Sequence, residues 1–205
     1  MINTTTWNGK KSTQWFDPEN WTHGIPSTNL HAYIPSETES GRFPSVAEKL
    51  CIDFTLKNDG KFANEGLIVL KENGIFQNAG IFENHEIATL VNSGNMTNTG
   101  ELINSGTLDN HKIFTNHGKL HNEGLFENEN TVVNPGSWMN TGTIDNFGLI
   151  SNAGGTLENY NIIENKDQGK IENKGFIPED LINDFSPIKY TPSIDEIIFQ
   201  KNTIE

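Results

Sequence analysis

The sequence predicts an all-β chain built around a parallel β-solenoid, and three observations lead to this prediction. A six-residue unit, Gly-x-apolar-x-Asn-x, repeats almost without interruption from about Gly60 to about Gly175. The apolar residue and the Asn of each unit are two positions apart, as on one face of an extended strand. No helical period of 3.6 residues fits this stretch. A single short strand cannot bury its apolar face, but stacked copies can, which is the principle of a solenoid.

Asparagine is the most regular residue of the repeat, recurring at a step of six from Asn92 to Asn152. The apolar residue two positions earlier keeps the same step and is the expected core: Met96, Leu102, Leu108, Phe114, Leu120, Phe126, Val132, Trp138, Ile144 and Ile150. Asn and Gly both tolerate positive φ, so each unit is expected to be a short strand followed by a corner. Stacked Asn amides would pair along a ladder rather than stay buried without partners.

The size of one coil is predicted from an alternation between successive units. The residue after Gly alternates between polar and mostly apolar, and the core residue alternates between two sets of side chains. Units therefore pair into 12-residue repeats, which favours a flattened, two-sided coil of twelve residues. A coil of twenty-four residues is the alternative, and a triangular coil of eighteen would lose the alternation. Twelve-residue stacking also gives favourable histidine–acid pairs. These are His111 with Glu123, His117 with Glu129, and His121 with Asp109.

Three regions are expected along the chain: an N-terminal Trp/Pro-rich β cap over residues 1–59, the solenoid over residues 60–175, and a C-terminal cap or tail over residues 176–205. The first region contains Trp7, Trp15 and Trp21 and lacks the regular repeat. These rings are expected to plug the open end of the solenoid, where unpaired strand edges would otherwise invite association. As an alternative, the same three tryptophans are ligand-binding candidates, because aromatic faces stack on sugars.

The cap also carries an ordered set of short motifs. They are Thr6-Trp7-Asn8-Gly9, Trp15, Asn20-Trp21, Gly24-Ile25-Pro26, Ile34-Pro35 and Phe43-Pro44. Over roughly residues 5–60 this pattern resembles the opening of large secreted surface proteins of the Bacteroidetes, and it is similar to the starts of autotransporter-associated β-strand proteins. The resemblance implies a right-handed parallel β-helix, a secreted or cell-surface location and a non-catalytic scaffold. No signal peptide is visible in residues 1–6, which lack its charged and apolar regions.

Composition argues against several classes of partner. The 27 acidic and 14 basic residues give a net charge of −13, and such a surface repels the phosphates of nucleic acid. No apolar run approaches 18 residues, so no membrane insertion is expected. Cys51 is the only cysteine, which excludes an internal disulfide, and it is expected in the core as a small apolar residue.

No catalytic residues and no cofactor are predicted. General acid–base catalysis needs paired groups within reach of one substrate. The acids are expected on opposite sides of the coil, with Asp109, Asp145 and Glu158 on one side and Glu127 and Glu164 on the other. The candidates for a metal site are His111, His117, His121, Glu123 and Glu129. Outward charge pairing is the favoured interpretation of these residues, and Ca²⁺ on the acidic rows is kept as an alternative.

The predicted function is that of a non-catalytic, extracellular structural or adhesive protein, with fibre or matrix formation as one form of it. A carbohydrate-binding module, assisted by Ca²⁺ in one version, is the alternative. An ice-binding protein and a polysaccharide-degrading β-helix enzyme are more distant. The threonine row behind the ice-binding hypothesis is Thr107, Thr131, Thr143 and Thr156. The expected partners are surface glycans or a second copy. Self-association would use an outward apolar stripe of Ile113, Leu125, Leu149 and Ile162, covered by the tail or by that copy.

Overall fold

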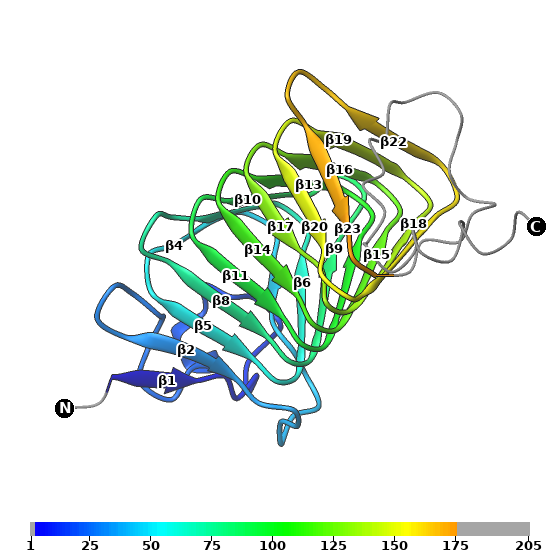
Figure 1. Cartoon of the computed structure of the whole chain (residues 1–205). Coiled ribbons are helices and arrows are strands. Elements are labelled where there is room, and N and C mark those ends of the chain that lie inside the picture. The colour runs from blue at the N-terminus through cyan, green and yellow to red at the C-terminus, as the bar shows by residue number, and fades with distance from the viewer. Residues whose placement is uncertain (1–2, 176–205) are drawn as a thin grey trace, which may run out of the picture.

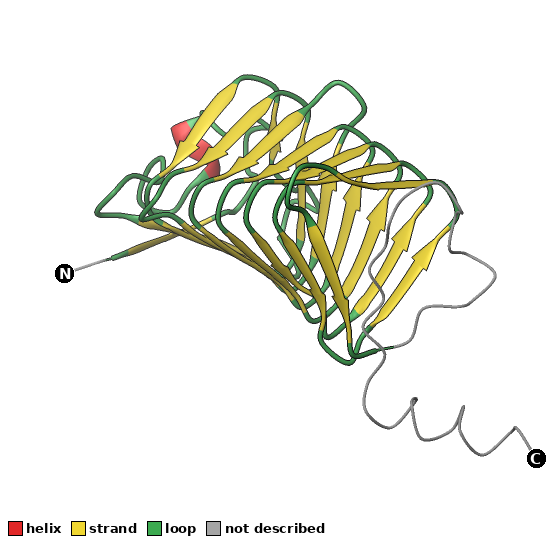
Figure 2. Cartoon of the chain, turned by 45° about the horizontal axis from the view of Figure 1, so that its top comes forward, coloured by secondary structure: helices red, strands yellow, loops and turns green. Residues whose placement is uncertain are grey.

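Three parallel sheets wrap around one core in the computed structural model, which describes residues 3–175 (Figure 1). Each coil of the chain adds one strand to each sheet, so neighbouring strands within a sheet are mostly three apart in the numbering. Within residues 3–175, every regular element is a strand apart from one 3-10 turn, η1 (Pro18–Asn20). Figure 2 shows this turn near the N-terminal end and the loops that join the sheets. The predicted all-β parallel solenoid is confirmed.

The bounds of the strands follow the three sheets. The first sheet has nine strands: β1 (Thr4–Thr6), β2 (His31–Ile34), β5 (Thr55–Asn58), β8 (Ile75–Asn78), β11 (Asn95–Asn98), β14 (Ile113–Asn116), β17 (Thr131–Val133), β20 (Leu149–Asn152) and β23 (Lys170–Asn173). The second sheet has seven: β3 (Ser45–Val46), β6 (Lys61–Asn64), β9 (Ile81–Asn84), β12 (Glu101–Asn104), β15 (Lys119–Asn122), β18 (Ser137–Asn140) and β21 (Thr156–Asn159). The third also has seven: β4 (Lys49–Ile52), β7 (Leu67–Leu70), β10 (Thr89–Asn92), β13 (Thr107–Asn110), β16 (Leu125–Asn128), β19 (Thr143–Asn146) and β22 (Ile162–Asn165).

The regular coil contains eighteen residues, so the predicted 12-residue repeat and its alternative of twenty-four are wrong. Asn92 pairs with Asn110, and Leu102 pairs with Leu120, across neighbouring strands of their sheets. Stacked residues are thus three units apart. The alternation was misleading for a physical reason. The residue after Gly faces outward, where polar and apolar side chains are both tolerated. Each core residue also packs against the other two sheets, so its size does not report which residue lies above it.

Additional residues are confined to corners between sheets. A regular corner has two residues, and longer corners occupy residues 71–74, 85–88, 153–155 and 166–169. The repeated glycine is needed at the corner because stacked backbones approach closely there. A Cβ on Gly100 would lie 2.1 Å from the carbonyl oxygen of Gly80 in the preceding coil. The expected positive φ is not its role, since the described glycines with positive φ all lie outside the regular units.

The predicted core is confirmed, and the asparagines form three ladders inside it. Asn122 illustrates the arrangement: its Oδ1 accepts from Nδ2 of Asn104 at 2.7 Å, and its Nδ2 donates to Oδ1 of Asn140 at 2.7 Å. Its Nδ2 also donates to the Thr143 carbonyl oxygen at 3.0 Å, which satisfies a backbone acceptor of the next coil. Twelve-residue stacking would have paired Asn122 with Asn110 and Asn134 instead. Since buried amides need partners, the ladders explain why Asn recurs in every unit from Asn92 to Asn152.

The N-terminal tryptophans extend this core. Trp15 lies 4.7 Å from Trp21 and 5.2 Å from Phe62 between ring centroids, and the three cap tryptophans are at most 4% exposed. Their faces are therefore unavailable to a sugar, so the predicted stacking platform is wrong, while their packing supports the cap interpretation. The sheets already include β3, β4 and β5, so strand stacking starts before residue 60. Buried Asn20 ties down the cap loop, because its Oδ1 accepts from the backbone N–H groups of Lys11 and Ser12.

Two further expectations concern the ends and the cysteine. The predicted tail of residues 176–205, and with it any cover for an apolar stripe, lies outside the described residues. Cys51 is exposed on the outer face of β4, so its expected place in the core is wrong. Within residues 3–175, the structure has no helix that is long and apolar enough to cross a membrane.

Candidate functional site

The outward side chains are the variable part of the solenoid. In the four-residue strands the second and fourth side chains are buried, except that Asn165 of β22 is only partly buried, and the first and third face outward. Each sheet therefore presents two outward columns, with stacked residues about 4.8 Å apart. Because the interior repeats and the columns do not, the columns are the part of the rod that can distinguish one ligand from another.

One surface stands out by its lack of charge. We call the outward side chains of β8, β11, β14, β17 and β20 the uncharged face. It consists of Ile75, Gln77, Asn95, Thr97, Ile113, Thr115, Thr131, Val133, Leu149 and Ser151. Within these five described strands no outward side chain is ionisable, although the chain carries a net charge of −13. Lys57 on β5 bounds the face at one end, and Lys170 on β23 bounds it at the other.

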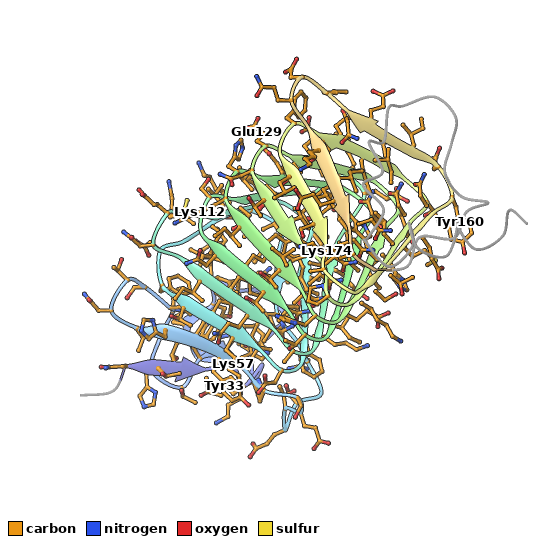
Figure 3. All side chains as sticks on the ribbon, viewed as in Figure 1. Tyr33, Lys57, Lys112, Glu129, Tyr160 and Lys174 are labelled. Carbon is orange, nitrogen blue, oxygen red and sulfur yellow. The ribbon has the colours of Figure 1, made fainter. Side chains whose placement is uncertain are left out.

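The N-terminal border of the uncharged face is well ordered. The Nζ of Lys57 donates to Oδ2 of Asp59 at 2.8 Å and lies 5.2 Å from the ring centroid of Tyr33. Figure 3 shows Tyr33 and Lys57 together at that end of the rod. The hydroxyl of Tyr33 also donates to Asp59 at 3.0 Å. Burial, followed by this hydrogen bond, raises the pKa of Tyr33. The contacts with Asp59 offset the positive charge of Lys57, so this border adds little net charge beside the uncharged face.

The expected apolar stripe is not continuous. Ile113 and Leu149 lie on the first sheet with Thr131 between them, whereas Leu125 and Ile162 lie on the third sheet with Thr143 between them. The prediction is wrong because it relied on twelve-residue stacking. The threonine row fails for the same reason. Its four residues, Thr107, Thr131, Thr143 and Thr156, are divided among all three sheets.

The third sheet presents the opposite kind of surface. Asp109, Glu127, Asp145 and Glu164 occupy the same outward column in four successive coils, and we call them the carboxylate row. They were expected on two different sides, which is wrong, since eighteen-residue stacking places them on one. The first three strands of this sheet carry Cys51, Val69 and Val91 in the same column. The sheet therefore changes from apolar to acidic along the rod.

Lys166, together with His111 when its ring is protonated, partly neutralises the carboxylate row. The His111 ring lies between two carboxylates: Nε2 is 2.7 Å from Oδ2 of Asp109, and Nδ1 is 2.6 Å from Oε2 of Glu129. Further along, the Nζ of Lys166 is 2.5 Å from Oδ2 of Asp145 and 3.6 Å from a Glu164 oxygen. Figure 3 shows Glu129 and Lys112, the residue after His111, along one edge of the rod.

Glu127 lies between these two neutralised groups. Burial raises its pKa, and the neighbouring carboxylates of Asp109 and Asp145 raise it further. Burial alone would lower the pKa of the His111 ring, but the hydrogen bonds and charges of Asp109 and Glu129 outweigh burial and raise it. The row therefore favours protons, or other cations, more than isolated exposed acids would.

The structure brings only two of the predicted metal candidates together. His111 and Glu129 meet, and the acid that joins them is Asp109. His121 lies on β15 of the second sheet, and Glu123 follows that strand and accepts from the Ser105 hydroxyl at 2.8 Å. His117 lies at another corner, after β14. The sequence did contain a signal for the correct group, because His111 and Glu129 occupy equivalent positions eighteen residues apart.

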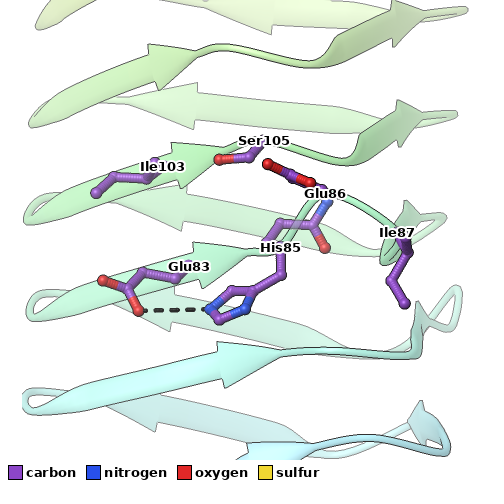
Figure 4. Close-up of a pocket in the computed structure, with 7 residues that line it drawn as sticks. Glu83, His85, Glu86, Ile87, Ile103 and Ser105 are labelled. Atoms are coloured by element: carbon purple, nitrogen blue, oxygen red, sulfur yellow. Dashed lines mark ion pairs between the residues drawn. The ribbon is translucent and has the colours of Figure 1, made fainter.

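A shallow hollow of about 590 Å³ lies beside the long corner of residues 85–88, which joins β9 to β10 (Figure 4). Its lining includes Glu83, His85, Glu86, Ile87 and Ile103. Glu83 and His85 form an ion pair at 3.6 Å between half-exposed side chains, and Ile87 is 91% exposed. The hollow is open, and its one ion pair is well hydrated, so it offers little selectivity for a ligand.

Comparisons with protein-family models, curated proteins and solved structures found no match to this chain.

Proposed function

We propose that this chain is a non-catalytic structural and adhesive rod that acts at the cell surface or outside the cell and adheres to uncharged polysaccharide. The uncharged face is the single observation that carries the proposal. Five successive strands display ten outward side chains in register without an ionisable group. The extracellular location is part of the proposal and depends on the resemblance of residues 5–60 to secreted surface proteins.

The chemistry of the uncharged face suits a neutral sugar polymer. Hydroxyl and amide groups of residues such as Gln77, Thr97 and Thr115 can both donate and accept hydrogen bonds, as sugar hydroxyls require. Ile113, Val133 and Leu149 provide apolar area between them for C–H surfaces. An anionic polymer would be repelled by the net charge of −13, and a cationic one would favour the carboxylate row.

The interior favours adhesion by holding the face in shape. Each strand of the face is fixed by a buried apolar residue, and most end in a ladder asparagine. A ligand that binds such a preorganised surface loses less free energy in ordering the protein. The same rigidity supports the structural role, because the interior holds the uncharged face at a fixed position along the rod.

A second copy of the chain is a less suitable occupant of this face. Four residues at about 3.3 Å and five strands at about 4.8 Å span roughly 13 by 24 Å, or about 300 Å². A stable protein–protein interface needs about 800 Å² from each partner. Two copies would also repel one another through their net charges of −13. We therefore expect the uncharged face to engage extended polymers through many weak contacts rather than to form a closed dimer.

Cosedimentation with insoluble neutral polysaccharides, cellulose and chitin, together with a neutral glycan array, tests the proposal. Wild-type protein should bind at least one of these ligands, and Thr115→Asp should bind at least tenfold more weakly, since it places a charge in the centre of the face. Ser137→Asp, an outward position on β18 of the second sheet, is the matched control and should bind like wild type.

Four results would contradict the proposal. If wild type binds no neutral glycan, neutral polysaccharide is not the partner. If Thr115→Asp and Ser137→Asp lose equal affinity, the uncharged face is not the binding surface. Release of reducing ends from the bound polymer would show catalysis. Inhibition of ice recrystallisation by wild type, without glycan binding, would replace the polysaccharide by ice as the partner.

A further inference from the structure

We propose that Asp109, His111 and Glu129 form a binding site for one divalent transition metal ion of the zinc class. Asp109 is the second outward residue of β13, and His111 immediately follows that strand. Glu129 immediately follows β16, one coil further along the rod. The site therefore lies on the corner that joins the third sheet to the first, and the corner leads directly into Ile113 of the uncharged face.

The donor atoms lie near one another, and side-chain rotation would bring them to bonding distance of one ion. One nitrogen of His111 and one oxygen from each of the two carboxylates lie within 4.8 Å of one another. Imidazole nitrogen with carboxylate oxygen is a donor set that zinc accepts, and three protein ligands leave one position of a tetrahedron open. Ca²⁺ fits this set less well, because it prefers six to eight oxygen ligands and does not seek an imidazole.

An unsatisfied atom in the same group is a second, independent observation. Oδ1 of Asp109 is buried and has no hydrogen-bond partner among the described residues. A buried carboxylate oxygen without a protein partner is uncommon, and a bound water or ion commonly satisfies such an atom. A metal held by Asp109 would supply that partner, since a carboxylate can ligate through either oxygen. Simple pairing of His111 with its two neighbours leaves Oδ1 unexplained.

Hydrogen bonds of His111 keep the three side chains together. With both ring nitrogens protonated, His111 donates to Asp109 at 2.7 Å and to Glu129 at 2.6 Å, and it holds the two carboxylates on either side of the ring. Metal binding releases one ring proton to solvent. The freed nitrogen lone pair then binds the ion, and the other nitrogen keeps its N–H bond. With Nδ1 freed, Nε2–H keeps its hydrogen bond to Oδ2 of Asp109, so Glu129 binds the ion through Oε2 and Asp109 binds it through the unpartnered Oδ1.

The surrounding charges favour a cation here. Glu127 lies beside Asp109 in the carboxylate row and has no ion-pair partner among those the described residues form. Lys112 follows His111, but its Nζ donates to the backbone carbonyl oxygen of Glu72 at 3.0 Å. Lys166 is engaged by Asp145 and Glu164. Both lysines are thus held by other groups, and the residual charge near His111 is negative.

Calorimetric titration of the full chain with ZnCl₂, after treatment with a chelator, tests the site, and Co²⁺ absorption reports its geometry. Wild type should bind one ion with a tetrahedral Co²⁺ spectrum. His111→Gln should weaken zinc binding at least tenfold. Glu129→Gln should also weaken it and serves as the second variant in case His111→Gln does not fold. His117→Gln, at a corner that lacks Asp109 and Glu129, is the matched control and should bind like wild type.

The outcomes separate this site from the polysaccharide proposal, because metal binding is measured without any glycan. Wild type that binds no ion would overturn the site, as would unchanged binding in both His111→Gln and Glu129→Gln. An equal loss in His117→Gln would indicate nonspecific histidine binding and would also overturn it. If Ca²⁺ competes with Zn²⁺ at a similar concentration, the site binds through oxygen ligands alone and is not selective for the zinc class.

Discussion

The uncharged face and the carboxylate row are built on the same interior but present opposite exteriors. Strand β14 of the face and strand β16 of the row each bury a phenylalanine and end in a ladder asparagine. Their outward third residues are Thr115 and Glu127. The comparison shows that the inward positions determine the coil and that the outward positions are free to carry function. It also predicts that neighbouring residues of one strand respond very differently to the same substitution.

The largest effect is expected from an aspartate placed inside rather than outside β14. Phe114→Asp should unfold the rod, because an unpaired buried charge costs several kcal/mol. Thr115→Asp, the next residue, faces outward and should change the free energy of unfolding by no more than about 0.5 kcal/mol. Circular dichroism during urea titration measures both. A Phe114→Asp variant that melts like wild type would show that this position is not in the core.

The asparagine ladder should be the next most sensitive feature. Asn122→Leu removes the acceptor for Asn104 and the donor to Asn140, so we expect a loss of about 1–3 kcal/mol for each group left unsatisfied. Asn95→Leu makes the same change on the outside of β11 and should be nearly neutral. Urea titration compares the two variants. Equal losses would mean that stacking of the amides contributes little.

The smallest effect concerns Glu127 in the carboxylate row. The pKa of Glu127 is raised in the folded protein, so protonation of this carboxyl stabilises the fold. The stabilisation is fully present below the ordinary glutamate pKa of about 4.3 and is lost as the pH rises through the pKa of the folded state. Glu127→Gln should therefore stabilise metal-free protein at pH 7 by a few tenths to about 1 kcal/mol, because like charges in stacked strands are unfavourable.

A pH series identifies the cause of that gain. The advantage of Glu127→Gln over wild type should shrink as the pH falls towards 4. Glu101→Gln is the matched control, because Glu101 is stacked beside Lys119 and its removal should give no gain. If the gain in free energy of unfolding from Glu127→Gln persists unchanged at pH 4, its cause is packing rather than charge.

The sequence alone was sufficient for the interior and insufficient for the exterior. Core residues such as Phe126, and ladder residues such as Asn122, were predicted because burial restricts a position to one kind of side chain. The number of units per coil was not predicted correctly, because outward positions tolerate almost any residue and their alternation does not report the stacking. That one error divided the carboxylate row between two sides and paired His111 with Glu123 instead of Glu129. Acids at equivalent positions eighteen residues apart, Asp109, Glu127 and Asp145, were the available signal.

Both proposed binding surfaces depend on eighteen-residue stacking, and cysteine crosslinking measures this stacking directly. In a Cys51→Ser background, Thr97→Cys with Thr115→Cys places thiols eighteen residues apart on paired strands, about 4.8 Å apart in backbone position, within reach of a disulfide. Ile103→Cys with Thr115→Cys places them twelve apart, on β12 and β14 of different sheets. Upon oxidation, mass spectrometry should find an intramolecular disulfide in the first pair and free thiols in the second. A disulfide in the second pair and free thiols in the first would contradict the three-sided coil and both surfaces built on it.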